Sequence, residues 1–201
     1  MRPTHSWFVL IFLFGVALLQ PGCQGRSVSE LLWPDLHDAY FQLTKSWGRS
    51  GVVRDGLETE TRVVALLESA TWRKAYVRRY SEVFELTEEE TRKMLADQMQ
   101  AADEYTDFVV AVASTYSDDA RLTHRLTQWR VLLRQSPDQT AQPLEIRHMD
   151  VHPSQLQAFY PHHHPWQRYY KVRFPKTDAP IELLFTGPAG GFSLEWEESD
   201  W

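Results

Sequence analysis

Alternation of apolar and polar side chains near the C-terminus is the feature that most restricts how this chain can fold. Between Gln167 and Phe174, the residues Tyr170, Val172 and Phe174 take every second position, and Trp166 extends the same face. A period of two places alternate side chains on opposite faces of a half-buried β-strand. Clusters of Gly and Pro mark where the chain must reverse. The C-terminal region therefore predicts three strands, at 166–174, 180–186 and 192–197.

Three further strands are predicted upstream, at 108–113, 128–135 and 143–151. The first is a short run rich in β-branched residues, for which we favour a strand over a continuation of the preceding helix. Ser136 to Thr140 is expected to turn the chain so that the second and third segments pair. Short turns favour antiparallel pairing, because parallel neighbours need long crossovers.

The first half of the chain instead shows the spacing of three and four residues that is typical of amphipathic helices. Thr87 and Glu90 have the spacing of a capping box, which predicts a helix from 88 to 105. Thr71 is the expected cap of the aromatic stripe before it, and Gly48 to Gly56 is expected to be a loop. The predicted helical segments are 26–47, 57–84 as one bent helix or two short ones, 88–105, and one turn within 154–160.

Helices followed by strands are the order of the α+β class. We expect N-terminal helices packed on a C-terminal antiparallel β-sheet or sandwich of about six strands. The predicted organisation is a signal peptide over 1–22, a helical region over 23–105 and an antiparallel β region over 106–201. The last two regions are expected to form one compact domain.

Charge excludes one class of partner. The chain has a formal net charge of −6, and the first 25 residues contribute one base, Arg2, and no acid, so the rest has −7. Phosphate binding relies on clustered basic side chains. We therefore expect no nucleic-acid partner, and we interpret the acidic segment from Glu195 to Asp200 as a solvated tail.

The N-terminus has the composition of an export signal. Arg2 precedes an uncharged run from Trp7 to Leu19, and Gly22 and Cys23 follow. This run is shorter than the about 20 residues that cross a bilayer, so we predict secretion rather than a membrane-spanning helix. Cys23 is the single cysteine of the chain and lies where the signal would be cut. Lipidation explains this position, because an exported cysteine otherwise lacks a disulfide partner.

This segment resembles the signals of bacterial lipoproteins, in which a lipobox ends in the lipidated cysteine. Leu19, Gly22 and Cys23 match the motif, whereas Gln20 stands where the family usually has Leu. The resemblance implies a membrane anchor at Cys23. Because Gln24 is not the Asp that retains such proteins at the inner membrane, it also implies the periplasmic face of the outer membrane. Ordinary cleavage and a soluble periplasmic protein are the alternative.

His148, Asp150 and His152 are the first candidate metal ligands. Alternate residues of a strand share a face, and two His with one carboxylate suit zinc or ferrous iron. A straight strand holds the outer pair about 13 Å apart, so the chain would have to bend for all three to reach one ion. The alternative, which we favour, is that His148 continues a core face while Asp150 and His152 begin a turn.

The second candidate is the His-rich loop after Pro161, in which His162 and His164 could together face an ion. We favour a polar loop here, and hence no cofactor. The aromatic residues between Trp72 and Tyr80 have a spacing of four, so they are expected to pack on the sheet while the bases among them face solvent. No Gly-x-Ser-x-Gly or His-Glu-x-x-His motif is present, and we assign no catalytic residue.

Several segments resemble predicted bacterial lipoproteins of unassigned function. They are 71–77, 159–161, 166–170, 172–175 and the Gly-rich hairpin that ends at Trp196. The resemblance implies a fold and a cellular location. We therefore expect an exported lipoprotein that serves as a non-catalytic structural, accessory or protein-binding module of the envelope. The alternative is a metal-binding protein or a metal-dependent hydrolase that uses His148, Asp150 and His152 with the 162–164 loop.

Metabolic labelling with radioactive palmitate tests the anchor. We expect label in the wild-type chain and none in Cys23→Ser, because the cysteine thiol is the predicted acceptor. Equal labelling of the two chains would exclude Cys23 as the site, and absence of label from both would contradict lipidation.

Overall fold

The computed structural model describes residues 38–55, 59–116, 120–123, 127–178 and 180–197. All of them belong to one compact unit, His37–Trp201. The predicted signal peptide over 1–22, Cys23 and most of the predicted helix over 26–47 lie outside the described residues.

Nine strands in two antiparallel sheets make up the β-structure of the described residues. Sheet A has the order β1-β2-β3-β7-β6, and sheet B has the order β5-β4-β8-β9. The strands of sheet A are β1 (Gly48–Asp55), β2 (Thr59–Leu67), β3 (Tyr105–Ser114), β6 (Glu145–His148) and β7 (Arg168–Pro175). Those of sheet B are β4 (Arg130–Ser136), β5 (Gln139–Ala141), β8 (Ile181–Gly187) and β9 (Gly190–Trp196).

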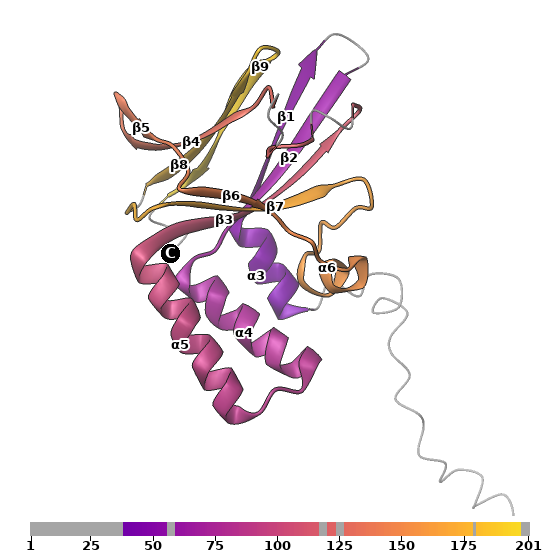
Figure 1. Ribbon diagram of the computed structural model, residues 1–201, viewed down its shortest axis with the longest axis vertical. Helices are drawn as coiled ribbons and strands as arrows, with labels where there is room; N and C mark the ends of the chain where they lie inside the picture. Colours follow the sequence, from indigo (N-terminus) through magenta and orange to yellow (C-terminus); the bar gives the residue numbers. More distant parts are fainter. Residues whose placement is uncertain (1–37, 56–58, 117–119, 124–126, 179, 198–201) are drawn as a thin grey trace, which may run out of the picture. The chain divides into compact units, whose positions relative to one another are not determined.

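Four helices complete the described fold: α3 (Ala39–Trp47), α4 (Ala70–Phe84), α5 (Glu88–Glu104) and α6 (Pro153–Phe159). Side-chain caps fix where they begin. Asp38 accepts from two amides at the start of α3, and Thr87 and Glu90 form the predicted capping box of α5. The helices lie on one side of sheet A, and sheet B lies on the other (Figure 1). The predicted α+β class is confirmed.

The main core fills the space between the two sheets. Phe108 of β3 and Trp196 of β9 meet there with ring centroids 5.3 Å apart, and the indole N–H of Trp196 donates to the main-chain oxygen of Trp47 at 2.8 Å. Tyr170, Val172 and Phe174 of β7 are all buried, as their alternation predicts. The helices pack on the other face of sheet A.

The structure corrects the N-terminal half of the prediction. Residues 48–55, within the segment expected to be a loop, and 59–67, expected to be helical, are the hairpin β1–β2, which is paired from Gly48↔Leu66 to Asp55↔Thr59. In the last part of β2 both faces are buried, because Ala65 faces sheet B while Leu66 lies on the helix side. An apolar run without alternation cannot be distinguished from a buried helix by its period.

Three further expectations were wrong, about strand pairing, burial and a helix cap. Strand 128–135 does not pair with 143–151, because β4 pairs with β5 and β8 in sheet B, whereas the short β6 pairs with β7 in sheet A. Trp166, expected on the buried face, precedes β7 and is 79% exposed. The N-cap of α4 is Ser69 rather than Thr71.

No helix among the described residues is long and apolar enough to cross a membrane.

The two sheets approach each other closely at Gly51 of β1, which leaves no room for a side chain. A Cβ added there would lie 2.2 Å from Cδ2 of the Phe192 ring in β9. Gly51→Ala should therefore lower the free energy of unfolding by about 1–3 kcal/mol, as overpacking of a core does. Denaturant titration measures this change.

The matched control is Gly48→Ala, whose added Cβ would come no closer than 3.4 Å to another atom. Gly48→Ala should lower the free energy of unfolding by less than Gly51→Ala does. Equal losses in the two variants would show that contact with Phe192 does not set the requirement for glycine.

Candidate functional site

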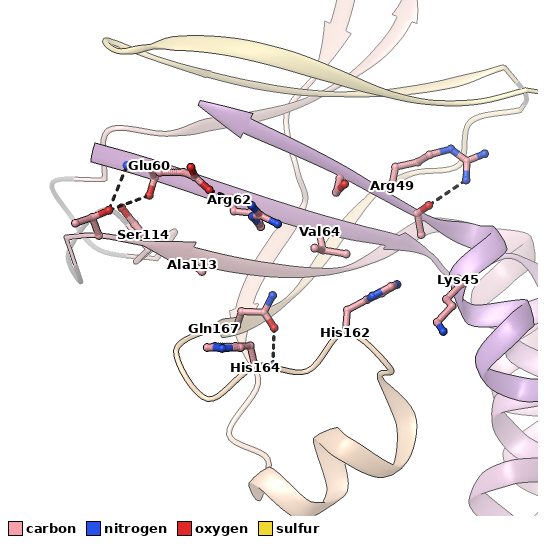
Figure 2. Close-up of a pocket in the computed structure, with 13 residues that line it drawn as sticks. Lys45, Arg49, Glu60, Arg62, Val64, Ala113, Ser114, His162, His164 and Gln167 are labelled. Carbon is pink, nitrogen blue, oxygen red and sulfur yellow. Dashed lines mark hydrogen bonds and ion pairs between the residues drawn. The ribbon is translucent and has the colours of Figure 1, made fainter. Parts of the chain in front are cut away.

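A groove of about 880 Å³ opens on the helix-side face of sheet A. It lies between the strands β1, β2 and β3 and the loop that contains the His-rich segment (Figure 2). Small side chains such as Val64 and Ala113 leave room between the longer polar ones. The lining residues are Lys45, Gly48, Arg49, Ser50, Glu60, Arg62, Val64, Ala113, Ser114, Thr115, His162, His164 and Gln167.

Local hydrogen bonds hold the loop wall of the groove. The amide of His164 donates to the side chain of Gln167 at 2.9 Å, and the amide of Gln167 donates back to the main-chain oxygen of His164 at 3.0 Å. Tyr169 of β7 donates its hydroxyl to the same Gln167 side chain at 3.0 Å. His163 is turned the other way and packs on Tyr169 with ring centroids 5.6 Å apart. Burial lowers the pKa of His163, which keeps its ring neutral.

The opposite wall carries one carboxylate among several cations. Glu60 accepts from Arg62 at 3.1 Å and from Arg54 at 3.2 Å. The hydrogen bond from Arg62 lowers the pKa of Glu60, and the charge of Arg54 adds to that effect. Lys45 reaches the groove from the last turn of α3. Cationic groups and neutral hydrogen-bonding groups therefore dominate the lining.

The structure separates the predicted metal ligands into three places. His162 and His164 line the groove, whereas His148 and Asp150 line a second hollow on the same face of sheet A. His152 caps α6, where its Nδ1 accepts from the amide of Ser154 at 3.3 Å. Among the described residues, no three His, Cys, Asp or Glu side chains are grouped so as to hold a metal ion. The zinc or iron site stays a prediction.

The second hollow, here called the cleft, has a volume of about 320 Å³. It lies where α4, α5 and the chain after β6 surround the exposed part of β7. Aromatic side chains form one wall, and charged side chains form the floor and rim. The lining residues are Glu68, Trp72, Tyr76, Gln98, Arg147, His148, Met149, Asp150, Val151, Tyr160 and Lys171.

A buried ion network lies beneath the cleft, and Arg73 of α4 is at its centre. Its Nη2 is 2.7 Å from Oδ2 of Asp107 and 3.0 Å from Oε2 of Glu68. Its Nη1 donates to the side-chain oxygen of Gln98 in α5 at 2.6 Å. The side chains of Arg73 and Asp107 are 1% and 0% exposed. The prediction that the bases of this helix all face solvent was wrong for Arg73.

Strand β7 supplies the other cations of the network. Arg173 forms two hydrogen bonds to Asp107, both at 2.9 Å, and Lys171 donates to Glu68. Burial alone would raise the pKa of Asp107, but hydrogen bonds from Arg173 and Arg73 and the nearby charge of Lys171 hold it below its usual value. Asp107 is therefore ionised at neutral pH.

Sequence analysis missed this network because its members are far apart along the chain. Glu68 and Arg73 lie at the start of α4, while Asp107 and the pair Lys171 and Arg173 come from β3 and β7. One available signal was Asp107 itself, a carboxylate directly before the apolar run of β3. A buried acid in such a position requires a cation, but the sequence does not say which one.

Comparisons with known proteins add no functional information. No protein-family model matches the chain, and no curated protein matches it. Among solved structures, the chain is similar to a novel protein of unknown function from Burkholderia pseudomallei, with 13% sequence identity and a TM-score of 0.43. That similarity covers 84% of this chain and 87% of the other.

Asp107→Asn should lower the free energy of unfolding at pH 7 by about 3–5 kcal/mol, because it leaves buried cations without their carboxylate. The pKa of Asp107 is lowered on folding. Its contribution is therefore complete above the unfolded pKa of about 3.9 and is lost as the pH falls through the folded value. Denaturant titrations of both chains should show a difference that shrinks only below about pH 4.

The control for Asp107→Asn is Glu145→Gln. Glu145 pairs with Arg147 at 3.4 Å, and the two side chains are 49% and 64% exposed. An exposed pair of this kind should contribute less than about 1 kcal/mol. Similar losses in the two variants would contradict a structural role that is specific to the buried network.

Proposed function

We propose that this protein is an exported, membrane-anchored lipoprotein that acts as a non-catalytic binding module of the cell envelope. The observation that carries the binding role is the groove on sheet A, which is large, open and bordered by hydrogen-bonding side chains. Cys23 would hold the chain to the membrane, and the groove would bind an envelope protein. The expected location is the periplasmic face of the outer membrane.

Support for export and anchoring comes from the sequence. The short uncharged run from Trp7 to Leu19 ends just before Cys23, which is the order of a lipoprotein signal. Two or three acyl chains on one cysteine would hold a protein firmly on a membrane, whereas one chain would not.

Support for binding comes from how the groove is built. Its walls are a three-stranded part of sheet A and a loop fixed by the hydrogen bonds between His164 and Gln167. Sites formed on rigid elements change little on binding, so the groove is suited to accept a partner without folding first. Lys45 and Arg62 border it, which favours a partner segment with acidic or strongly polar side chains.

Site-specific photocrosslinking in intact cells tests this function. A benzophenone amino acid in place of Arg62, in the groove, should give a discrete crosslinked product with an envelope protein. The same residue in place of Arg130, exposed on β4 of sheet B, should not give that product. Lys45→Glu should reduce the yield from position 62, because it reverses a charge at the border of the groove.

Equal crosslinking from positions 62 and 130 would contradict a binding role for the groove. So would a yield that Lys45→Glu leaves unchanged. Separation of inner and outer membranes from the same cells tests the cellular location. Recovery of the protein in the soluble periplasmic fraction would contradict the membrane anchor.

A further inference from the structure

Two tyrosine hydroxyls in the cleft have no hydrogen-bond partner within the described part of the chain. The ring of Tyr76 in α4 packs against Trp72 and Phe159, with ring centroids 5.1 and 5.2 Å apart, so its hydroxyl end is what reaches the cleft. Tyr160, which follows α6, also lines the cleft. Neither hydroxyl is among the buried polar groups that lack a partner. Both hydroxyls are therefore open to the cleft.

Glu68 adds an acceptor to these hydroxyls. Its Oε2 lies 3.0 Å from Nη2 of Arg73 and also accepts from Lys171, whereas no hydrogen bond from the described residues reaches its Oε1. Burial raises the pKa of Tyr160, and the charges of Glu68 and Tyr76 add to that effect, so the three groups lie close together. Burial also raises the pKa of Tyr76. Both tyrosines therefore keep their protons, and the cleft offers donors and acceptors side by side.

Charges of the two signs balance in the lining of the cleft. Its carboxylates are those of Glu68 and Asp150, and its cations are Lys171 and Arg147. A lining of this kind favours neither an anion nor a cation. A neutral ligand avoids the cost of removing an ion from water, while a ligand without polar groups would leave the hydroxyls and Oε1 of Glu68 unsatisfied. The lining therefore favours a ligand that is polar and uncharged.

Size and apolar contacts narrow the class further. The cleft has a volume of about 320 Å³, at the lower end of the range for small-molecule sites. Met149 and Val151, which are both half-buried, supply apolar surface beside the polar groups. A sugar ring has the matching chemistry, because its hydroxyls both donate and accept while its C–H groups pack on apolar side chains.

We propose that the cleft binds a neutral sugar of one or two rings. Hydroxyls of the sugar bond to Tyr76, Tyr160 and Oε1 of Glu68, and a C–H face lies on Met149 and Val151. This site is separate from the groove, and the inference does not rest on the partner proposed there.

Titration followed by saturation-transfer NMR tests the proposal, with the purified full-length chain in a detergent that carries no sugar. The probes are glucose, N-acetylglucosamine and maltose. At least one of them should bind saturably, with a dissociation constant of about 1 mM or lower. Glucuronate and glucosamine add a negative or a positive charge to a glucose ring. Neither should bind more tightly than glucose, because the charges of the lining balance.

Variants that remove single hydroxyls locate the site. Tyr76→Phe and Tyr160→Phe should each weaken binding of the tightest probe about threefold to tenfold, because each removes one hydrogen bond to the sugar. Both variants should unfold at the denaturant concentration of the wild type, since neither hydroxyl bonds to another described residue. The matched control is Tyr116→Phe, which removes the hydroxyl of a tyrosine that is 56% exposed and outside the lining. It should bind the probe as the wild type does.

Absence of saturable binding for all three probes would overturn the proposal, as would tighter binding of glucuronate or glucosamine than of glucose. Wild-type affinity in both Tyr76→Phe and Tyr160→Phe would also overturn it, since the sugar would then bind elsewhere. An equal loss of affinity in Tyr116→Phe would have the same meaning.

Discussion

The ion pair between Arg73 and Asp107 is the contact on which the arrangement of helices and sheet A depends. Arg73 connects α4 to β3 through Asp107 and to α5 through Gln98, so one guanidinium joins three elements. Removing these charges from water is costly, and the remaining members of the network offset the cost by satisfying each carboxylate. We interpret the network as what fixes the position of α4, since apolar packing alone tolerates sliding.

Both hollows arise where the helices stop covering sheet A. The groove lies over the part of β1, β2 and β3 away from α4 and α5, and the cleft lies where those two helices meet β7. The chain from Tyr160 to His164 borders both, with Tyr160 in the cleft and His162 in the groove. The same loop thus borders two hollows with different linings, one open and polar, the other smaller and partly aromatic.

Prediction from the sequence succeeded where one face of an element meets solvent. Alternation in 166–174 identified β7, and the capping box at Thr87 identified the start of α5. It failed for β2, because sheet B and the helices bury both faces of Ala65 to Leu67 and remove the alternation there. For the sites, His162 and His164 of the His-rich loop, considered as metal ligands, lie in the lining of the groove. The network was missed because its ion pairs join residues 34 and 66 positions apart.

By itself, the sequence determined the α+β class and most strand positions, because periodicity, turn residues and apolar runs are local properties. Only the tertiary structure decided which strands share a sheet and which charges meet. Pairing placed β6 against β7 rather than β4, and so brought Arg147 beside Lys171. The physical reason is that hydrogen bonding between strands and burial of charge depend on neighbours in space, which a linear pattern does not encode.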